Sequence, residues 1–287
     1  KTFATRPRKE PHAALPCPLC GGRAFRPLWD LADFSFVTCR GCGLVQQNPQ
    51  PLAESVLARY DESYLEYESA RQFDYATLER RALADLRFPV IEAEVFREAA
   101  SLQRKPRILD VGCATGALLA TFREAGWDCV GVEPCAPAAE YGRERFKLDI
   151  RSSTLEEASL KAASFDVIHA SHLIEHVNDP VAFLREVVRL VAEDGYVIIT
   201  TPNIEGFQAR LLGAAWRSAI YDHLYLFSGS TLPAMLSTCG LRVLHSITWG
   251  GWAAGLRPSF MKKPLDLAAK RLGFGDVMAF LCRRDRP

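Results

Sequence analysis

The sequence lacks long apolar runs and has almost no net charge. No stretch approaches the roughly 18–20 consecutive apolar residues that a transmembrane helix needs, and its first residues do not contain the apolar core of a secretory signal peptide. The formal net charge is only +1, so no overall electric field draws the chain to nucleic acid or to an acidic membrane. We therefore expect a cytoplasmic protein without a membrane span.

Low complexity and strong compositional bias are also absent. A chain of 287 residues with 48% hydrophobic residues is long enough for one sizeable α/β domain and a small accessory unit. Basic residues gather at both ends, with Lys1, Arg6, Arg8 and Lys9 at the front and eight lysines and arginines over residues 257–286. Solvated chain ends explain this pattern, and a phosphorylated or nucleotide-linked substrate is the alternative.

The cysteines are the first chemistry-bearing residues along the chain. Cys17 and Cys20 form one Cys-x-x-Cys pair, and Cys39 and Cys42 form a second pair after 18 intervening residues. A glycine follows each pair, which suits a tight turn whose two thiolates face one ion. Four thiolates in a reducing compartment favour a closed, tetrahedral Zn²⁺ site with a structural role, and the residues between the pairs predict a hairpin ribbon. A redox pair, free thiols and an iron–sulfur centre are the alternatives.

Two helices are expected between this ribbon and the rest of the chain. Residues 52–68 show helical character, with three tyrosines, Tyr60 and Tyr64 among them, spaced along one face. These tyrosines form either a packed aromatic stripe or a lid over a ligand pocket. A second helix is predicted over residues 77–101, with an interruption at Pro89.

A glycine-rich turn joins a predicted strand to a predicted helix in the middle of the chain. Residues 107–111 form a short apolar strand, Gly112 and Gly116 frame the turn, and the following helix ends at Gly126. Such a turn lets a ligand approach the main chain and presents helix N-terminal amides to it. The next strand ends in Glu133, where a ribose held by the turn would meet a carboxylate.

Asp110 decides which cofactor this turn suits. The dinucleotide fingerprint Gly-x-Gly-x-x-Gly has two glycines in the tight turn, whereas this chain reads Asp110-x-Gly112-x-x-x-Gly116. An acid would be repelled by a pyrophosphate but attracted by the ammonium group of a methionine moiety. The charge therefore favours S-adenosylmethionine (SAM) over NAD.

The same stretch resembles the class I SAM-dependent methyltransferases. Residues 110–116, Asp-Val-Gly-Cys-Ala-Thr-Gly, match that family's Asp-x-Gly-x-Gly-x-Gly element, with Ala114 in place of the middle glycine. Residues 164–180 resemble the family's fourth strand and following helix, and residues 193–203 its fifth strand. The resemblance implies S-adenosylhomocysteine as product and a cofactor-binding set of Asp110, Gly112, Cys113, Gly116, Glu133, Thr154, Leu155, Ala170 and His172.

A closer resemblance covers more of the chain. The four-cysteine ribbon, the tyrosine-rich helix and residues 222–228 look like a bacterial subgroup whose members often serve polysaccharide, modified-sugar or natural-product pathways. The implied fold is α/β and Rossmann-like, a seven-stranded, mostly parallel sheet with an antiparallel last strand, preceded by a small zinc ribbon. The expected division is a flexible tail over residues 1–14, the ribbon over 15–48, a helical connector or lid over 49–104 and the SAM-binding domain over 105–287, with closing strands at 241–249 and 275–283.

Histidines supply the candidates for acid–base chemistry. SAM carries its own leaving group, so the protein must mainly align the acceptor, and a general base helps if the acceptor is a hydroxyl or an acidic carbon. His223, in the loop after the fifth strand, is the first candidate, with helix capping or shaping of the SAM pocket as its alternative role. His172, at the end of the fourth strand where ligands bind in such sheets, is the second candidate. Tyr64 would help to close the site, and His169 is expected to be a buried core residue.

The sequence thus predicts a SAM-dependent methyltransferase that acts on a small-molecule, sugar or glycan acceptor by O- or C-methylation. Two alternatives stay open. The ribbon could dock an RNA or protein substrate, although it lacks the dense basic–aromatic surface of nucleic-acid grooves. Ala114 could mark a non-catalytic protein that keeps the SAM-binding fold. The acceptor and the oligomeric state are left open by the sequence.

Overall fold

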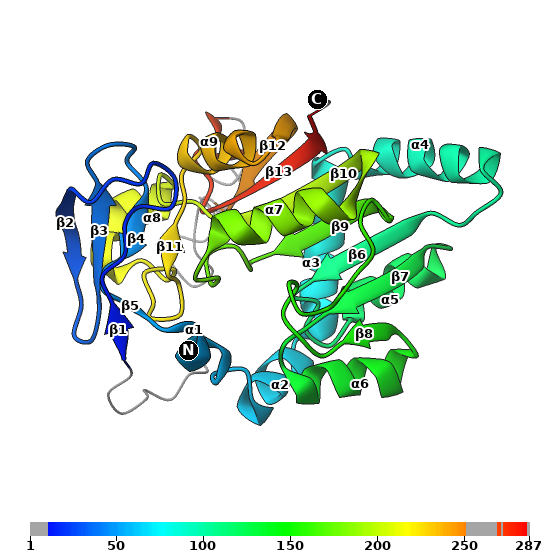
Figure 1. Cartoon of the computed structure of the whole chain (residues 1–287), viewed down its shortest axis with the longest axis horizontal. Helices are drawn as coiled ribbons and strands as arrows, with labels where there is room; N and C mark the ends of the chain where they lie inside the picture. The colour runs from blue at the N-terminus through cyan, green and yellow to red at the C-terminus, as the bar shows by residue number, and fades with distance from the viewer. Residues whose placement is uncertain (1–10, 251–268, 271, 286–287) are drawn as a thin grey trace, which may run out of the picture.

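The computed structural model describes residues 11–250, 269–270 and 272–285. Within them the chain forms a large central sheet, a smaller sheet at one end and a short pairing of β1 (His12–Ala13) with β5 (Gln50–Pro51) (Figure 1). Residues 1–10 of the predicted flexible tail and most of the basic stretch over residues 257–286 lie outside the described residues. Among the described residues, no helix is both long and apolar enough to cross a bilayer.

The central sheet has seven strands in the order β12-β13-β10-β9-β6-β7-β8. Strands β6 to β10 run parallel, and β13 lies antiparallel between β10 and β12. The bounds are β6 Arg107–Val111, β7 Asp128–Val132, β8 Asp149–Arg151, β9 Phe165–Ser171, β10 Val191–Pro202, β12 Leu241–Trp249 and β13 Val277–Arg284. The predicted seven-stranded α/β sheet with an antiparallel last strand is confirmed.

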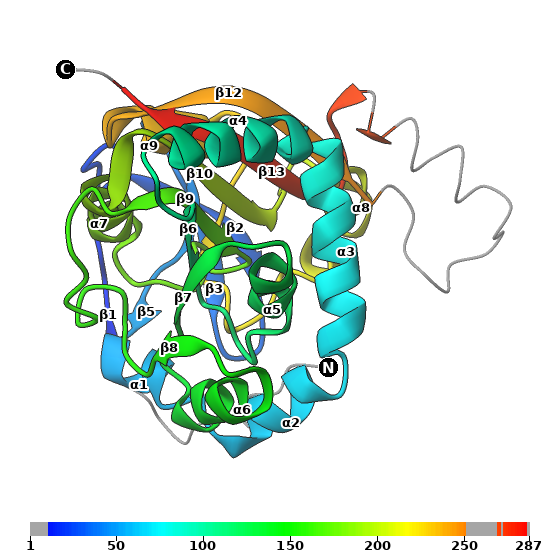
Figure 2. The ribbon, with the colours of Figure 1, turned by 90° about the vertical axis from the view of Figure 1, so that its right-hand side faces the viewer.

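Helices cover both faces of this sheet, so its inner strands are apolar on both sides. One face packs against α3, α4 and α5 and the other against α7 and α9, as Figure 2 shows for α3 and α7. Neighbouring residues of one strand enter opposite layers: Ile108 joins the first core and Leu109 the second. The bounds are α3 Gln72–Asp85, α4 Phe88–Ser101, α5 Ala117–Glu124, α6 Ala136–Phe146, α7 Pro180–Leu190, α8 Phe207–Leu212, the 3-10 turn Gly213–Ala215 and α9 Thr231–Thr238.

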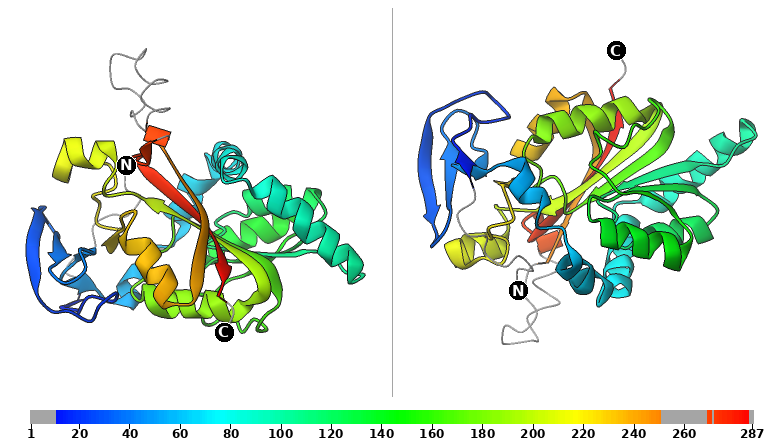
Figure 3. Two further views of the ribbon diagram at one scale, coloured as in Figure 1. Left: turned by 90° about the horizontal axis from the view of Figure 1, so that it is seen from above. Right: turned by 60° about the horizontal axis from the view of Figure 1, so that its bottom comes forward.

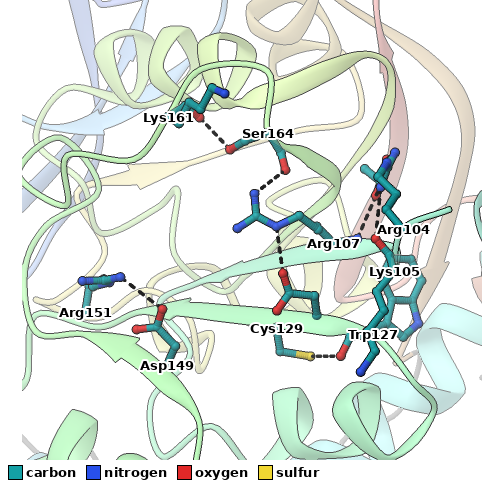
Figure 4. Close-up of polar contacts among 11 residues, drawn as sticks. Arg104, Lys105, Arg107, Trp127, Cys129, Asp149, Arg151, Lys161 and Ser164 are labelled. Carbon is teal, nitrogen blue, oxygen red and sulfur yellow. Dashed lines mark hydrogen bonds and ion pairs between the residues drawn. The ribbon is translucent and has the colours of Figure 1, made fainter. Parts of the chain in front are cut away.

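Charged side chains tie the amino ends of the strands together. Arg107 Nε lies 2.9 Å from Asp128 Oδ2, and Arg107 Nη1 donates to the main-chain oxygen of Ser164 at 3.0 Å (Figure 4). Arg104 donates two hydrogen bonds of 2.6 Å to the carboxylate of Asp166. Such two-pronged pairs fix geometry as well as charge, so β6 is anchored to both of its neighbours, β7 and β9, at the edge opposite to the cavity described below.

The small sheet joins the cysteine segment to a distant part of the chain. Its order is β11-β4-β3-β2, with bounds β2 Phe25–Asp30, β3 Ser35–Cys39, β4 Val45–Gln47 and β11 Tyr225–Leu226. The predicted hairpin is present as β2 and β3. Strand β4 then pairs antiparallel with β11, a long-range pairing that the sequence did not indicate. Figure 3 shows this sheet and α4 at opposite ends of the molecule.

The helices of the connector break at other positions than predicted. The helix expected over residues 52–68 is split into α1 (Ala53–Leu57) and α2 (Glu62–Ser69), because the side chain of Asp61 accepts a hydrogen bond from the Ser63 amide at 2.9 Å and caps a new helix. The helix expected over residues 77–101 with an interruption at Pro89 is two helices, α3 and α4, and the break lies two residues before the proline, at Arg87, which takes a left-handed φ of 64°. Pro89 lies in the first turn of α4, where proline is favoured, and so it begins a helix and does not interrupt one.

Candidate active site

A cavity of about 1000 Å³ opens at the carboxyl ends of the parallel strands. Its wall combines the turn after β6, the ends of β7 and β9, helices α2 and α3, and residues 217–223 between α8 and β11. The chain runs outward in one direction through β6, β7 and β8 and in the other through β9 and β10. Parallel α/β sheets bind their ligands at such a reversal of strand order.

The described side chains that line the cavity carry more negative than positive charge. Two arginines, Arg81 and Arg217, line it together with eight carboxylates. The carboxylates are Glu68, Glu79, Asp85, Asp110, Glu133, Glu156, Asp179 and Asp222. This balance suits a cationic or neutral ligand better than a phosphorylated one.

The turn after β6 has the backbone shape that glycine allows. Gly112 and Gly116 take φ values of 71° and 76°, and a Cβ on Gly116 would come within 2.8 Å of Leu148 Cδ1. Ala114, the departure from the resembled motif, has a φ of 48°, which costs a non-glycine residue about 1–2 kcal/mol. Its amide still donates a hydrogen bond of 2.9 Å to Glu133 Oε2. Alanine therefore strains the turn without removing its main-chain donor.

Glu133 faces this turn from the end of β7. Both of its oxygens accept main-chain hydrogen bonds of 2.9 Å, Oε2 from Ala114 and Oε1 from Cys135. The residue is 1% exposed, and burial raises the pKa of Glu133 to about 7 in spite of those two bonds. Each carboxylate oxygen keeps a further lone pair that a ribose hydroxyl can use. Ser153 also lines the cavity, and its buried hydroxyl has no hydrogen-bond partner among the described residues, so the wall fits a ligand that brings polar groups.

Asp110 lines the cavity and is paired within the protein. Its Oδ1 accepts a hydrogen bond from His169 Nδ1 at 2.7 Å, and His169 Nε2 lies 3.8 Å from Glu79 Oε2. Burial acts to lower the pKa of His169, but Asp110 and Glu79 outweigh it and raise the pKa to about 10. His169 is buried as expected, and it carries a positive charge at neutral pH between two carboxylates.

Tyr64 covers the Glu133 end of the cavity from α2. It packs against Cys135 and Ala138, and its ring centroid lies 5.1 Å from that of Tyr60. Burial, followed by the charge of Glu133, raises the pKa of Tyr64 well above its usual value, so the hydroxyl stays protonated. Both tyrosines line the cavity, which means that the stripe is packed and forms part of the pocket wall at the same time.

Three histidines gather where β9 ends. His172 Nδ1 lies 3.3 Å from Glu175 Oε1, and the ring centroids of His176 and His223 are 4.7 Å apart. His172 has a left-handed φ of 51°, a strained conformation of the kind that concentrates at functional sites. Its side chain is 43% exposed and lines the cavity.

The two candidate bases differ in how readily they accept a proton. Burial lowers the pKa of His223 to about 3, with His176 acting in the same direction. Partial loss of water beside the cavity wall acts to lower the pKa of His172, whose side chain is still 43% exposed, but Glu175 outweighs this effect and the pKa is raised. At neutral pH His223 is therefore a neutral and weakly basic imidazole, whereas His172 holds a proton more readily.

Most of the predicted site residues meet in this cavity. Two of them do not line it. Gly116 shapes the turn instead. Ala170 is buried within β9, while His169 and Ser171 on either side of it face the cavity, because successive residues of a strand point to opposite faces. The predicted residues that line the cavity are Tyr64, Asp110, Gly112, Cys113, Glu133, Thr154, Leu155, His172 and His223.

Sequence reasoning missed three polar residues at or beside the site. Glu79 comes from α3, and nothing in the helical pattern distinguishes it. Glu175 follows His172 by three residues, and this i, i+3 spacing was an available signal. Gln47 belongs to β4 and reaches the site through a contact between segments that are far apart in the chain.

The four predicted metal ligands converge in the ribbon. Each Sγ atom of Cys17, Cys20, Cys39 and Cys42 lies within 4.8 Å of the other three, and two of the distances are 3.4 and 3.5 Å. A tetrahedral zinc site with Zn–S bonds of about 2.3 Å needs about 3.8 Å between sulfurs. Against the effect of burial, main-chain amides of Cys42 and Gly41 lower the pKa of Cys39, whereas burial raises the pKa of Cys17 and Cys42. The donor set fits a tetrahedral metal ion.

Contacts from the ribbon and the connector hold the segment that carries His223. Gln47 Nε2 donates hydrogen bonds to the main-chain oxygens of Tyr221 at 2.8 Å and His223 at 2.7 Å. Arg59 forms a buried ion pair of 3.0 Å with Asp222. The position of His223 therefore depends on residues that precede the central sheet in the chain.

Parts of this chain are similar to known proteins. A family model described as a methyltransferase domain matches residues 80–246, more than half of the chain. The chain is 36% identical over 118 residues to the ubiquinone biosynthesis O-methyltransferase of Azorhizobium caulinodans and 33% identical over 117 residues to that of Rhodopseudomonas palustris. Each match covers 38% of this chain and 46% of the relative, so the chain spans just under half the length of these curated relatives. A solved SAM-dependent methyltransferase from Thermotoga maritima has the same fold, with a TM-score of 0.50 and 20% identity over 73% of this chain and 96% of that one.

Proposed function

Since the chain belongs to the methyltransferase-domain family, we propose that this SAM-dependent enzyme methylates a hydroxyl oxygen of a small-molecule or glycan-type acceptor without a phosphate group. The observation that carries the proposal is the cavity that joins Asp110, Gly112 and Glu133 on one side to His172 and His223 on the other. The name of the curated relatives, ubiquinone biosynthesis O-methyltransferase, supports methylation of oxygen on a small molecule. C-methylation is the second candidate reaction.

SAM supplies an electrophilic methyl group together with its leaving group. In this proposal the carboxylate of Glu133 accepts hydrogen bonds from the ribose hydroxyls, and Thr154 and Leu155 border the adenine. The turn at Gly112 lets the methionine end approach the main chain, and Asp110 attracts its ammonium group. His169 fixes the orientation of the Asp110 carboxylate through the 2.7 Å hydrogen bond.

The charge of the wall limits the acceptor. Eight carboxylates line the cavity against two arginines and the charged His169, so a phosphate or pyrophosphate would enter against repulsion. The phosphorylated or nucleotide-linked substrate that the basic C-terminal stretch suggested is therefore not favoured. A neutral phenol or sugar hydroxyl meets no such barrier.

We assign the acceptor's proton to His172. The proton moves from the acceptor oxygen to His172 Nε2 as the oxygen–methyl bond forms and the sulfur–methyl bond breaks, with sulfur keeping the electron pair and S-adenosylhomocysteine leaving. Glu175, 3.3 Å from His172 Nδ1, stabilises the resulting imidazolium. Such a base contributes about 10²–10⁴-fold to a rate. His223, the first candidate from the sequence, is the weaker base because burial lowers its pKa to about 3.

We also propose that the four cysteines bind a structural Zn²⁺ and that the protein works in the cytoplasm, where thiols stay reduced. The units are then the zinc ribbon over residues 15–48, a connector over 49–104 that covers the cavity with Tyr60 and Tyr64, and the SAM-binding domain over 105–287.

Methyl transfer from isotopically labelled SAM tests the proposal. The purified chain is offered phenols and hydroxylated sugars in one arm, their phosphorylated forms in a second, and ribosomal RNA and protein in a third, and mass spectrometry locates the methyl group. We expect methylated oxygen in the first arm and little product in the other two. Product confined to the third arm would replace this proposal with that of an RNA or protein methyltransferase.

A further inference from the structure

A second group of metal-type ligands lies at the wall of the cavity, apart from the cysteine ribbon. Ligand atoms of Glu175, His176 and His223 all lie within 4.8 Å of one another. Glu175 and His223 are buried and His176 is half-buried. Both histidines line the cavity, and methyl transfer as proposed above does not use the three residues as a group.

In both histidines a main-chain oxygen holds Nδ1, which leaves Nε2 as the ring nitrogen suited to bind a metal ion. His176 Nδ1 lies 2.8 Å from the main-chain oxygen of Asp222, and His223 Nδ1 lies 2.8 Å from that of Ser218. A carbonyl oxygen only accepts hydrogen bonds, so each Nδ1 carries the hydrogen and each Nε2 keeps a lone pair. Histidines that bind metals are oriented in this way, with the other ring nitrogen donating to a carbonyl or carboxylate.

Glu175 supplies a carboxylate oxygen that is not satisfied by hydrogen bonds. Oε2 accepts a hydrogen bond from Thr201 Oγ1 at 2.8 Å. Oε1 is buried and accepts none from the described residues, although His172 Nδ1 lies 3.3 Å away. Because the His172 contact is an ion pair and not a hydrogen bond, the buried carboxylate is only partly compensated, and a cation between it and the two histidines would complete that compensation.

The three residues are held by a rigid frame. The main-chain oxygen of Glu175 accepts hydrogen bonds from the amides of Leu224 at 2.7 Å and Tyr225 at 3.2 Å. Gln47 from the ribbon binds the main-chain oxygen of His223 at 2.7 Å. The end of β9 and the segment before β11 are thus fixed to each other, which is what a metal site needs from its support.

We propose that Glu175, His176 and His223 bind a divalent transition ion such as Zn²⁺, with its open side toward the cavity. Two imidazoles and one carboxylate suit Zn²⁺ or Fe²⁺ and not Mg²⁺ or Ca²⁺, which prefer shells of oxygen. Ligand bonds of about 2.0–2.2 Å require the three atoms to move together by less than about 1 Å. Three protein ligands leave a coordination position open, as in catalytic zinc sites.

The role of this ion rests on the proposed function. The open position faces the space assigned to the acceptor, so the ion would hold the acceptor oxygen and lower the pKa of its hydroxyl. His172, on the other side of Glu175, would remain available for the proton. An acceptor with two neighbouring oxygens fits best: one oxygen would take the open position and the second would expand the ion to five-coordination, which would fix the attacking oxygen in line with the methyl group.

Metal binding by the full chain tests the site without any activity measurement. Zn²⁺ is added to protein whose ribbon is already filled, in the absence of SAM and acceptor, and bound metal is counted after gel filtration. We expect a second equivalent in the wild type and its loss, with affinity reduced more than about tenfold, in Glu175→Gln and His176→Gln. His245→Gln, a histidine of β12 outside the cavity lining, is the matched control and should keep both equivalents.

If a variant fails to fold, the absorption spectrum of the Co²⁺-substituted wild-type protein tests the site instead. Co²⁺ in the ribbon gives thiolate-to-metal charge-transfer absorption, whereas Co²⁺ bound by Glu175, His176 and His223 gives ligand-field bands without it. A wild-type protein that takes up only the thiolate-bound ion would overturn the proposal, and so would Glu175→Gln and His176→Gln variants that bind the second ion as tightly as the wild type. The binding assay contains neither SAM nor acceptor, so a protein that does not bind the second ion leaves the methyl-transfer proposal standing. A protein that binds two ions but transfers no methyl group would count against the methyl-transfer proposal alone.

Discussion

Gln47 Nε2 lies 2.7 Å from the main-chain oxygen of His223, although 175 residues separate the two in the chain. The same amide group also bonds the main-chain oxygen of Tyr221 at 2.8 Å, and β4, which carries Gln47, pairs with β11 just after His223. The cysteine ribbon therefore holds the segment that carries His223 in the cavity wall, and it is more than an appendage to the SAM-binding fold.

Replacing Gln47 by leucine should loosen the His223 segment. Two carbonyl oxygens would lose their buried donor, which costs about 1–3 kcal/mol of folding stability, and small displacements near a reacting group can cost up to about 10²-fold in rate. We expect Gln47→Leu to lower kcat at least tenfold with little change in SAM affinity. Gln46→Leu is the matched control, because Gln46 is equally buried in β4 but donates to Leu15 at the other side of the ribbon. Equal kcat values for the two variants would contradict a link between ribbon and cavity.

Removal of the proposed ribbon zinc should lower activity as well as stability. The four thiols form a closed set, so losing the ion leaves them without a common partner and frees β4. We expect Cys42→Ser to lose one equivalent of zinc, to lower Tm and to lower kcat. Cys239→Ser, at the end of α9 and outside the ribbon, should change none of the three. Full activity in metal-free Cys42→Ser protein would contradict this prediction.

SAM affinity should fall as the pH drops below about 7. Burial raises the pKa of Glu133 to about 7 in the free protein, and ribose hydroxyls donate more strongly to the charged form. SAM thus binds the carboxylate, and acid weakens binding by up to about tenfold per pH unit below that pKa. Calorimetry between pH 5.5 and 8 checks the slope. Glu133→Gln should bind SAM about tenfold more weakly at pH 8 and lose the pH dependence; a wild-type affinity that is flat over this range would contradict the assignment.

Stability should fall as the pH rises from about 7 to 10. The folded-state pKa of His169 is raised to about 10, above its ordinary 6.5, because Asp110 and Glu79 outweigh the effect of burial. The stabilising charge is fully present below about pH 6.5 and is lost as the pH rises through 10. We expect Tm of the wild type to decline over this window and that of His169→Gln to start lower and change less. Parallel Tm profiles for the two proteins would show that His169 is not charged.

The assignment of the base predicts different effects for two histidines. His172→Gln should lower kcat by about 10²–10⁴-fold while SAM affinity stays within threefold. If His223→Ala retains turnover within about threefold, a barrier change under about 0.7 kcal/mol, a base role for His223 is excluded. A larger loss in His223→Ala than in His172→Gln, measured on protein with no ion bound at Glu175, His176 and His223, would reverse the assignment. His245→Gln is the control that should be neutral in both measurements.

Local sequence signals sufficed for the central sheet and for much of the site. The strands around the turn at Gly112, the closing strand over residues 241–249 and the convergence of four cysteines were all predictable, because glycine turns, apolar runs and Cys-x-x-Cys spacing act within a few residues. The helix break at Asp61 was not predicted, since capping by one carboxylate outweighed a continuous helical pattern. The break at Arg87 lies two residues before the interruption predicted at Pro89.

The sequence by itself was enough to predict the proposed cofactor site: Asp110 and Gly112 lie at the end of β6 and Glu133 directly after β7. The carboxyl ends of neighbouring parallel strands meet at one edge of the sheet. Only the tertiary structure decided the chemistry at the other end of the cavity. Burial and partners from distant segments determine the charge on His169, the low basicity of His223 and the grouping of Glu175 with two histidines. Neither burial nor such partners can be predicted from the local spacing of residues.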